Sequence, residues 1–240
     1  MNEATGYALG EVKKLSTVIA DRLASMIQSG LLRPGEHLVQ TELAERFGVS
    51  RVAARDALHL LRERGLAVDV PRKGTIVRPI CCKTVRDLFA VRRAVEGLAA
   101  RLACARMTAE VLERLEQAIR EQEALSEGGD RSQLVAKDWE FHEIIFDLCD
   151  NEPLKEVIVG LWARTRQARS LAQGEAAWGQ AWGRRSAARH REILEALRAR
   201  DPDAAEQAAI RTIALAEEEL VQGLREAGWG EDSQEALSHE

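Results

Sequence analysis

The chain has 240 residues and a formal net charge of -5, with 45% hydrophobic, 30% charged and 4% aromatic residues. This composition is typical of soluble helical proteins, and it excludes a membrane protein because no apolar run approaches the roughly 20 residues that a spanning helix needs. The length favours two domains over one. The N-terminus lacks the basic start and apolar stretch of a secretory signal, so we expect a cytoplasmic protein.

The charge is divided unevenly along the chain. Residues 1–80 contain 12 Lys and Arg against 9 Asp and Glu, a net charge of +3. Residues 81–240 contain 22 against 30, a net charge of -8. A small positive domain joined to an acidic one fits a protein that touches phosphate at one end only.

The first part of the chain predicts an arm, a helix and a turn. Residues 1–14 have no periodic apolar pattern and are expected to form a flexible arm, whereas apolar residues from Leu15 onward recur at helical spacing. Pro34-Gly35 cannot continue a helix and favours a type II turn. Thr41 then has the side chain and the position of the N-cap of a short second helix.

A third helix is predicted to begin after Ser50, its expected N-cap, with Gly48 supplying the preceding turn. On a helical wheel, Arg51, Arg55 and Arg62 cluster on one face. The residues of the apolar face are Ala54, Ala57, Leu58 and Leu61. One face therefore packs against the domain and the other is cationic, as in a helix that is presented to a DNA groove.

The segment after the third helix alternates like two short strands around Pro71-Arg72-Lys73-Gly74. A basic hairpin tip after a helix-turn-helix is a wing, which can reach an adjacent groove or its phosphates. We therefore expect residues 15–80 to form a winged helix-turn-helix domain that binds DNA. The residues expected at the DNA are Thr41, Ser50, Arg51, Val52, Arg55, Arg72, Lys73 and Gly74.

Beyond residue 80 no strand pattern recurs, and the fold class is predicted to be mainly α. We expect a linker at residues 81–85, an all-α antiparallel bundle of about six helices at residues 86–227, and a disordered tail at residues 228–240. The predicted helices run from Thr84 to Arg106, Thr108 to Ser126, Asp130 to Cys149, Glu152 to Ala172, Trp178 to Arg200, and Pro202 to about Ala227.

Three residues of the bundle could meet at one site. Asp138 and His142 lie four residues apart and hence on one face of a helix, and His190 on a distant helix is available to converge on the same interior. A carboxylate and imidazoles in this arrangement can share a metal ion or hydrogen-bond a ligand. The alternatives are an exposed contact within one helix and satisfied core histidines.

Arginines of the bundle are candidates for pairing with an anionic ligand. They are Arg92 and Arg93 in the first helix of the bundle, and Arg164, Arg166 and Arg169 in the helix that contains Trp162. An arginine that points inward would pair with an effector carboxylate bidentately, and we take Arg92 and Arg164 for this role. The alternative is a solvated face.

The stretch LRPGEHLVQTELAERFGVSRVAARDALHLLRERGLA resembles the winged helix-turn-helix of the GntR family of bacterial transcription regulators. The residues that fit the family pattern in register are Pro34, Gly35, Leu43, Ala44, Gly48, Val49, Ser50, Arg51, Arg55, Ala57, Leu58, Leu61, Gly65 and Leu66. Ala53 and Ala54 depart from it, since Pro and Val are frequent there, and Asp56 replaces Glu. The resemblance implies a DNA-binding regulator.

The run DxxxFH, followed by HxxILxAL and DPxxA, resembles the FCD ligand-binding domain of the FadR branch of GntR regulators, over most of residues 84–222. In metal-binding members an Asp and three His converge on zinc, nickel or a similar divalent ion, and a small carboxylate often completes the coordination. The resemblance implies that Asp138, His142 and His190 are three of these four ligands. The fourth falls at Ile213, which cannot ligate a metal, and Glu217 is a weak substitute.

Two interpretations of this pocket stay open. Two histidines and one carboxylate can still hold a divalent ion, with open positions for water and effector. Alternatively, the pocket has dispensed with metal, and His142 and His190 bond the effector directly. In both cases the effector-binding residues are taken to be Arg92, Asp138, His142, Arg164 and His190.

These observations predict a homodimeric, ligand-responsive bacterial transcription regulator. It would bind a short palindromic operator, and a small effector in the bundle, a carboxylate by resemblance, would control its affinity for DNA. A metal-dependent enzyme built on the bundle is the alternative from another class. We expect no enzyme, because the sequence has no nucleophile and base pair and no phosphate-cradling Gly-rich loop. An adaptor that uses the winged domain for protein contacts is disfavoured by the arginines of the third helix.

Overall fold

The computed structural model describes residues 14–128, 131–172 and 179–232. The chain divides into two compact units, Met1–Arg78 and Pro79–Glu240, each of which is described by itself. The predicted arm, apart from Lys14, and residues 233–240 of the predicted tail lie outside the described residues. Among the described helices, none is long and apolar enough to cross a membrane.

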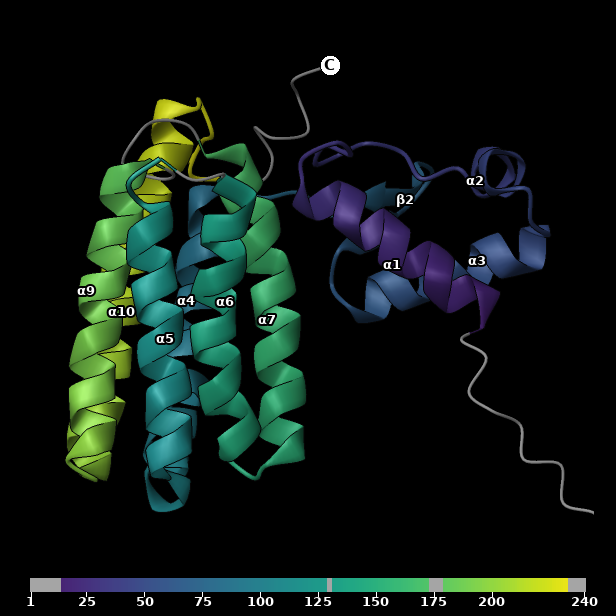
Figure 1. Ribbon diagram of the computed structural model, residues 1–240. Coiled ribbons are helices and arrows are strands. Elements are labelled where there is room, and N and C mark those ends of the chain that lie inside the picture. The colour runs from purple at the N-terminus through teal and green to yellow at the C-terminus, as the bar shows by residue number, and fades with distance from the viewer. Residues whose placement is uncertain (1–13, 129–130, 173–178, 233–240) are drawn as a thin grey trace, which may run out of the picture. The chain divides into compact units, whose positions relative to one another are not determined.

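The first unit contains the three helices and the hairpin that the sequence predicts (Figure 1). Its elements are α1 (Leu15–Gln28), α2 (Gln40–Phe47), α3 (Arg51–Glu63), β1 (Ala67–Val70) and β2 (Gly74–Val77). The two strands are antiparallel, with Val70 paired to Gly74 at the tip. The fully buried side chains at the centre include Leu23, Ile27, Leu61, Leu66 and Ile76. The apolar face predicted for the third helix is therefore the face that packs.

The turn predicted at Pro34-Gly35 is present. Gly35 has a φ of 84°, which is the left-handed conformation that the third residue of a type II turn requires. The N–H of Glu36 donates to the carbonyl of Arg33 over 3.1 Å and closes the turn. The N–H of Val77 then donates to the carbonyl of Glu36 over 2.8 Å, so the segment after the turn runs beside β2.

The turn between α2 and α3 also follows the sequence prediction. Gly48 ends α2 in the left-handed conformation, with a φ of 64°. The Oγ of Ser50 accepts a hydrogen bond from the N–H of Ala53 over 3.2 Å and caps α3. The start of the third helix is therefore fixed by local side-chain chemistry.

The prediction that Thr41 caps α2 is wrong. The helix begins one residue earlier, at Gln40, and Val39 occupies the N-cap position without a side-chain hydrogen bond. The Nε2 of Gln40 instead donates to the carbonyl of Arg51 over 2.7 Å. A contact between α2 and α3 thus replaces the local cap that the sequence suggested.

The second unit is a bundle of long helices that lie side by side (Figure 1). Its elements are α4 (Cys82–Ala103), the 3₁₀ helix η1 (Cys104–Arg106), α5 (Ala109–Leu125), α6 (Arg131–Leu148), α7 (Glu152–Leu171), α9 (Gln180–Arg198) and α10 (Pro202–Glu226). Six long helices were predicted here, and six are present among the described residues. The predicted helix starts at Asp130 and Trp178 lie outside the described residues.

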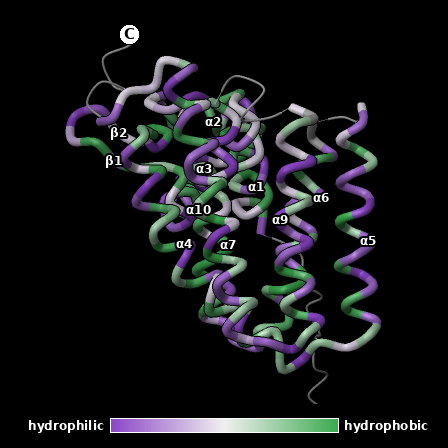
Figure 2. Tube along the Cα trace, turned by 90° about the vertical axis from the view of Figure 1, so that its left-hand side faces the viewer, coloured by the Kyte–Doolittle hydropathy of each residue, from purple (hydrophilic) through white to green (hydrophobic). Residues whose placement is uncertain are grey.

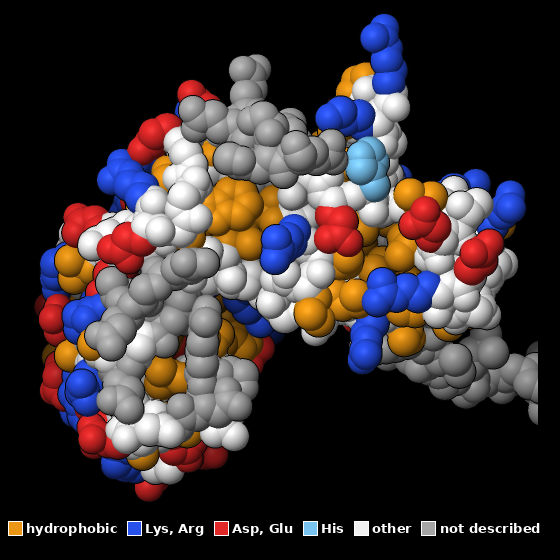
Figure 3. Space-filling view, turned by 90° about the horizontal axis from the view of Figure 1, so that it is seen from above, with side chains coloured by type: hydrophobic (Ala, Val, Ile, Leu, Met, Phe, Trp, Pro, Cys, Tyr) orange, Lys and Arg blue, Asp and Glu red, His pale blue; other side chains and the backbone are white. Residues whose placement is uncertain are grey.

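Local capping explains several helix starts of the bundle. The side chains of Thr108, Asn151 and Asp201 each accept a hydrogen bond from the backbone N–H three residues later. Along the helices, hydrophobic and hydrophilic residues alternate in stripes, as α5 illustrates (Figure 2). Lys and Arg are interspersed with Asp and Glu on the outside of the bundle (Figure 3). The apolar stripes therefore form the interior, as expected for a helical bundle.

The first helix of the bundle starts earlier than predicted. It begins at Cys82, two residues before Thr84, and the N-cap is Cys81, whose Sγ accepts a hydrogen bond from the N–H of Thr84 over 3.4 Å. Residues 82–85, which we assigned to a linker, therefore belong to α4. Cys82 and Val85 are fully buried, because this turn of the helix packs against the end of α10.

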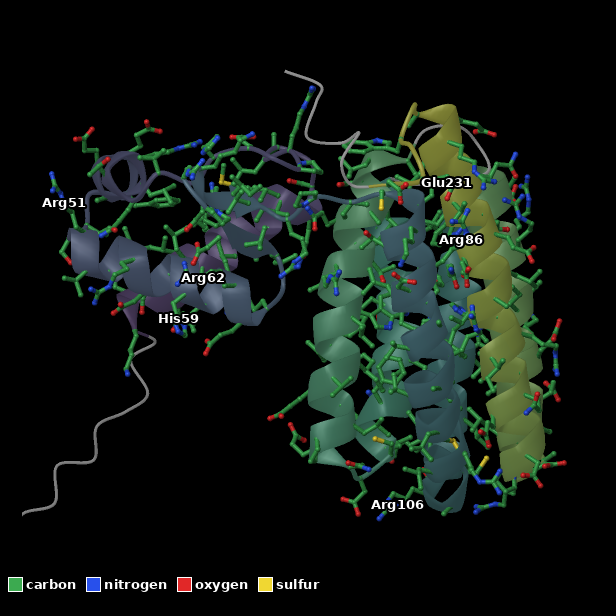
Figure 4. The ribbon with its side chains drawn as sticks, turned by 180° about the vertical axis from the view of Figure 1, so that it is seen from behind. Arg51, His59, Arg62, Arg86, Arg106 and Glu231 are labelled. Atoms are coloured by element: carbon green, nitrogen blue, oxygen red, sulfur yellow. The ribbon has the colours of Figure 1, made fainter. Side chains whose placement is uncertain are left out.

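Residues 228–232 were predicted to be part of a disordered tail, but the structure shows them in contact with the start of α4. The N–H groups of Cys82 and Lys83 donate to the carbonyls of Gly230 and Glu231 over 3.1 and 3.2 Å. The Glu231 carboxylate accepts two hydrogen bonds from Arg86, over 2.6 and 3.0 Å (Figure 4). We call residues 229–231 the C-terminal clasp.

The clasp is held by charge and by packing. Hydrogen bonds from Arg86 and Arg225 lower the pKa of Glu231 to about 2, so this carboxylate is ionised at neutral pH. The indole of Trp229 packs against the buried cluster that includes Val85 and Phe89. The predicted tail is polar overall, so its composition did not indicate that Trp229 would pack against the bundle.

Candidate functional site

The exposed face of α3 carries the side chains predicted to read DNA. Arg51, Val52 and Arg55 are exposed, and the Arg55 side chain, which is 65% accessible, forms an exposed ion pair with Asp56 at 3.6 Å. Arg51 extends outward from the first turn of the helix (Figure 4). Because Ser50 fixes where α3 begins, it also fixes where these arginines are presented.

The tip of the hairpin presents the other predicted contacts. Arg72, Lys73 and Gly74 are all exposed. Arg72 and Gly74 have φ values of 68° and 78°, so the tip is tightly turned and its two basic side chains project from the strand ends. A groove of about 410 Å³ lies between α3 and the hairpin and is lined in part by Arg55 and Lys73.

Arg62, which the helical wheel grouped with Arg51 and Arg55, has a different role. Its Nη1 lies 3.4 Å from the Oδ1 of Asp69 and 3.5 Å from the Oγ1 of Thr75. The Thr75 hydroxyl donates to the same Asp69 oxygen over 2.6 Å. Arg62 therefore joins the hairpin to α3, so that the hairpin keeps a fixed position relative to this helix.

In the bundle, Asp138, His142 and His190 come together as predicted. All three are buried, and one potential ligand atom of each lies within 4.8 Å of the others. The Nε2 atoms of His142 and His190 are 3.1 Å apart, and the Nε2 of His190 is 3.5 Å from the Oδ1 of Asp138. The alternative of an exposed contact within one helix is excluded by this burial.

Two buried polar residues that the sequence analysis did not name complete this cluster. The Ser186 hydroxyl donates to the Oδ1 of Asp138 over 2.7 Å, and the Oε1 of Gln122 lies 2.9 Å from the Nδ1 of His190. Ser186 precedes His190 by four residues, so helical spacing could have indicated it. Gln122 lies on α5, and no local signal separates it from the other polar residues of that helix.

Gln122 determines which ring nitrogen of His190 carries the proton. The Nε2 of Gln122 lies 3.5 Å from the Asp138 carboxylate, which orients the amide so that its oxygen faces the Nδ1 of His190. The Nδ1 therefore carries the proton, and the Nε2 of His190 presents its lone pair toward His142 and Asp138. This arrangement orients a histidine for metal binding or for accepting a hydrogen bond.

The electrostatics of the cluster favour neutral histidines and an ionised carboxylate. Burial lowers the pKa of His190 to about 4 and holds the pKa of His142 well below its usual value. Burial alone would raise the pKa of Asp138, but the Arg169 guanidinium and the Ser186 hydroxyl hold it well below its usual value. All three side chains are thus in the form that can bind a metal ion at neutral pH.

The arginine that approaches this cluster from α7 is Arg169 and not Arg164. The Nη1 of Arg169 donates to the Oδ2 of Asp138 over 3.0 Å, whereas Arg164 is half-buried and does not line the cavity at the cluster. The reason is helical spacing. Arg169 lies seven residues after the buried Trp162 and shares its face, but Arg164 lies only two residues after it.

Arg92 is buried as predicted and belongs to a second polar group. Its Nε donates to the Oε1 of Glu96 over 2.5 Å, and the Nε1 of Trp162 donates to the same oxygen over 3.1 Å. The guanidinium lies 4.4 Å from the centre of the Trp162 ring. Arg93, the neighbouring candidate, pairs instead with Glu217.

A cavity of about 10 Å³, enough for about one water molecule, lies at the cluster, and we call it the polar cavity. Its lining includes Arg92, Asp138, His142, Arg169, Arg189 and His190. Ile213 also lines it, at the position where the family resemblance places a fourth ligand. Glu217 is held by Arg93 and does not line the cavity, so it does not replace that ligand.

The donor set fits a divalent metal ion. Asp138, His142 and His190 offer one carboxylate oxygen and two imidazole nitrogens, and Gln122 supplies the second hydrogen bond that orients a ligating histidine. The carboxylate keeps Oδ1 toward the histidines while Arg169 engages Oδ2. Three protein ligands leave coordination positions open, as a site that also takes a small ligand requires.

Comparison with known proteins identifies both units. Residues 15–77 match the gntR family of bacterial regulatory proteins, and residues 87–215 match the FCD domain. The HTH-type transcriptional repressor RspR of Escherichia coli is 30% identical over 178 residues, which cover 74% of this chain and 76% of RspR.

Two further relatives match over shorter regions. The uncharacterized HTH-type transcriptional regulator YdhC of Bacillus subtilis is 32% identical over 139 residues, and the Nta operon transcriptional regulator of Aminobacter aminovorans is 34% identical over 139 residues. These matches cover 58% and 57% of this chain, and the chain spans only 62% and 65% of the length of these relatives.

Solved structures show the same fold. The structure of Escherichia coli McbR/YncC matches with a TM-score of 0.73 and 23% identity, covering 87% of this chain and 97% of that one. A putative GntR regulator from Rhodococcus sp. RHA1 matches with a TM-score of 0.69 and 23% identity, covering 86% and 97%. Because the family is one of regulatory proteins, the expectation that the chain is not an enzyme is confirmed. The chain belongs to the gntR family of bacterial regulatory proteins, in the branch that carries an FCD domain.

Proposed function

We propose that the chain is a ligand-responsive transcription regulator that works in the cytoplasm and binds a short palindromic operator as a homodimer. The observation that carries this proposal is the exposed cationic face of α3 beside a basic hairpin tip. Arg51 and Arg55 would read base edges or adjacent phosphates in the major groove, and Arg72 and Lys73 would reach the neighbouring phosphates. Ser50, Thr41, Val52 and Gly74 are exposed in the same unit and would help to fix the docking.

Arg55→Ala is expected to weaken specific operator binding by roughly 1 to 3 kcal/mol, because an arginine that contacts a base edge contributes about this much. The measurement is fluorescence anisotropy at fixed salt, with an operator obtained by selection from random duplexes. Arg106→Ala is the matched control, because it removes the same charge from η1 of the bundle (Figure 4). Equal operator affinity in both variants would contradict the role of Arg55.

The bundle is proposed to hold the effector, a small carboxylate, at the polar cavity. Asp138, His142 and His190 would hold a divalent ion such as zinc or nickel, and the ion would supply positive charge that completes the binding of the carboxylate. Arg92 lies in the wall of the same cavity and would pair with the effector. An effector that binds one arrangement of the two units better than another would shift the affinity for DNA.

The metal site is tested by thermal unfolding of chelator-treated protein after metal is added back. A divalent ion at about 100 times its Kd is expected to stabilise the fold by about 2.7 kcal/mol, which corresponds to a rise in Tm of roughly 5 to 10 °C. His190→Ala is expected to abolish this rise. His59→Ala, which removes an exposed histidine on α3, is the matched control and should retain it.

A chelator-treated wild-type protein whose Tm is unchanged by Zn²⁺, Ni²⁺ and Mn²⁺ would contradict the metal site. The effector would then be bonded directly by His142 and His190. The role of Arg55 at the operator does not depend on this result, because its side chain lies in the other unit.

A further inference from the structure

Val52 is an exposed apolar residue in the first turn of α3. Its side chain is 56% exposed, whereas the other apolar side chains of this helix are buried or half-buried. It contributes little to the stability of α3, because an exposed side chain gains nothing from burial and a β-branched residue has a lower helix propensity than alanine. A single exposed valine is common on protein surfaces, so its place on the helix decides what it can contact.

The direction of Val52 is almost opposite to the buried face of α3. At about 3.6 residues per turn, its side chain points about 170° away from the mean direction of that face. The residues of the buried face are Ala54, Ala57, Leu58 and Leu61. The hydrogen bond from the N–H of Ala53 to the Oγ of Ser50 fixes the backbone of the same turn. Val52 is therefore the side chain that would lie deepest in a groove that receives the start of α3.

The two sides of Val52 carry opposite charges. Arg51 and Arg55 lie on one side of it and Asp56 lies on the other, and all three are exposed. The hairpin flanks the arginine side, because Arg55 and Lys73 line the groove between α3 and the hairpin. Phosphates attract the arginines and repel the Asp56 carboxylate. When the arginine side faces the DNA backbone, Val52 therefore faces the edges of the bases.

The major groove offers one kind of apolar group to such a side chain. Each base pair presents hydrogen-bond donors and acceptors there, and thymine adds its C5-methyl group. Val52 has a hydrocarbon side chain without donor or acceptor, so it can bury this methyl group but cannot satisfy the amino group of cytosine or adenine. Because a β-branched side chain keeps one rotamer in a helix, Val52 loses little conformational entropy in this contact.

We propose that Val52 reads a thymine in each half of the operator through the C5-methyl group of that base. Arg51 and Arg55 hold α3 in the groove, and Val52 specifies one base pair. This inference rests on the proposed function, because it requires that α3 occupies the major groove. It gives Val52 a part in sequence specificity in addition to docking.

The test uses the full-length protein and an operator that it selects from random duplexes. Each thymine is replaced in turn by deoxyuridine at the symmetric positions of both half-sites, which removes the C5-methyl group and leaves the base pairing unchanged. At one position the Kd of the wild-type protein is expected to rise about 15-fold, because each methyl-sized group that is buried contributes about fourfold and two are lost. Fluorescence anisotropy at fixed salt measures the Kd.

Val52→Ala connects this effect to the side chain. The variant is expected to bind the thymine operator about 15-fold more weakly than the wild type and to lose most of the difference between thymine and deoxyuridine. Val52→Ile keeps a branched hydrocarbon and should keep that difference. Val18→Ala is the matched control, because it makes the same substitution at a position of α1 that is 48% exposed. It should retain the wild-type Kd for both duplexes.

The outcomes separate this inference from the proposed function. Failure to select any operator would overturn both. A selected operator without a constant thymine in each half-site, or a Kd that no deoxyuridine replacement changes, would overturn the role of Val52 and leave DNA binding in place. A preference for thymine that is as strong in Val52→Ala as in the wild type would show that another side chain reads the methyl group.

Discussion

Glu96→Ala is expected to lower the free energy of unfolding of the bundle by roughly 3 to 5 kcal/mol, because it leaves a buried guanidinium without its partner. Arg92 and Glu96 are each 2% exposed, and Glu96 also accepts the indole N–H of Trp162. The variant therefore creates an unpaired charge and an unsatisfied donor in the interior at once. Urea unfolding followed by far-ultraviolet circular dichroism measures the change.

The same helix provides a matched control for this variant. Lys83 and Asp87 form an ion pair with the same spacing of four residues, but both side chains are more than 60% exposed. Asp87→Ala is therefore expected to change the stability little or not at all. The double variant Arg92→Leu, Glu96→Leu, which removes both charges, should recover most of the loss. Equal effects of Glu96→Ala and Asp87→Ala would show that the buried pair does not have the role assigned to it.

Acidification is expected to destabilise the bundle between pH 7 and pH 5.5 through His142 and His190. Both have a folded-state pKa below that of an unfolded histidine, which is about 6.5, and for His190 it is about 4. The unfolded chain therefore binds protons in this range while the folded chain does not. The contribution of the two neutral histidines to the free energy of unfolding is present above pH 6.5 and is lost as the pH falls. For the two rings together, the free energy of unfolding decreases by roughly 2 to 3 kcal/mol at pH 5.5.

The measurement is urea unfolding at pH 7.0, 6.5, 6.0 and 5.5 in the presence of chelator. Asp138 stays ionised throughout this range, because its pKa lies well below the usual value, so its contribution does not change. His190→Gln should remove about half of the pH dependence, since one titrating ring remains. A free energy of unfolding that is the same at pH 7.0 and 5.5 would mean that the rings accept protons in the folded state.

Local chemistry made most of the fold predictable. Gly48 and Ser50 determine the turn and the start of α3 through their own backbone and side-chain preferences, and Asp201 does the same for α10. The predictions that were wrong concern features that depend on contacts between segments far apart in the fold or the sequence. Gln40 starts α2 because its amide reaches the carbonyl of Arg51, and the clasp is ordered because Trp229 finds an apolar surface that no window of nearby residues reveals.

In the candidate site, too, local spacing predicted some residues, whereas others depend on how distant helices pack. Asp138 and His142 could be paired from their spacing on one helix, and the resemblance to a known family supported His190 as the third member. Gln122 could not be predicted, because its importance depends on how α5 lies beside α9. The choice of Arg164 over Arg169 was avoidable, since Trp162 marks the buried face of α7 and Arg169 shares it.

The clasp has a consequence for the order in which the chain folds during synthesis. The first unit has all of its partners once Arg78 has left the ribosome. By contrast, α4 packs against α10 and is tied at its start to Glu231, so the first helix of the bundle must wait for the last described segment. At bacterial rates of translation this delay is of the order of ten seconds. During that time the apolar stripe of α4 is without α10, its native cover, and a nascent chain that stops before Trp229 lacks the clasp at the start of α4.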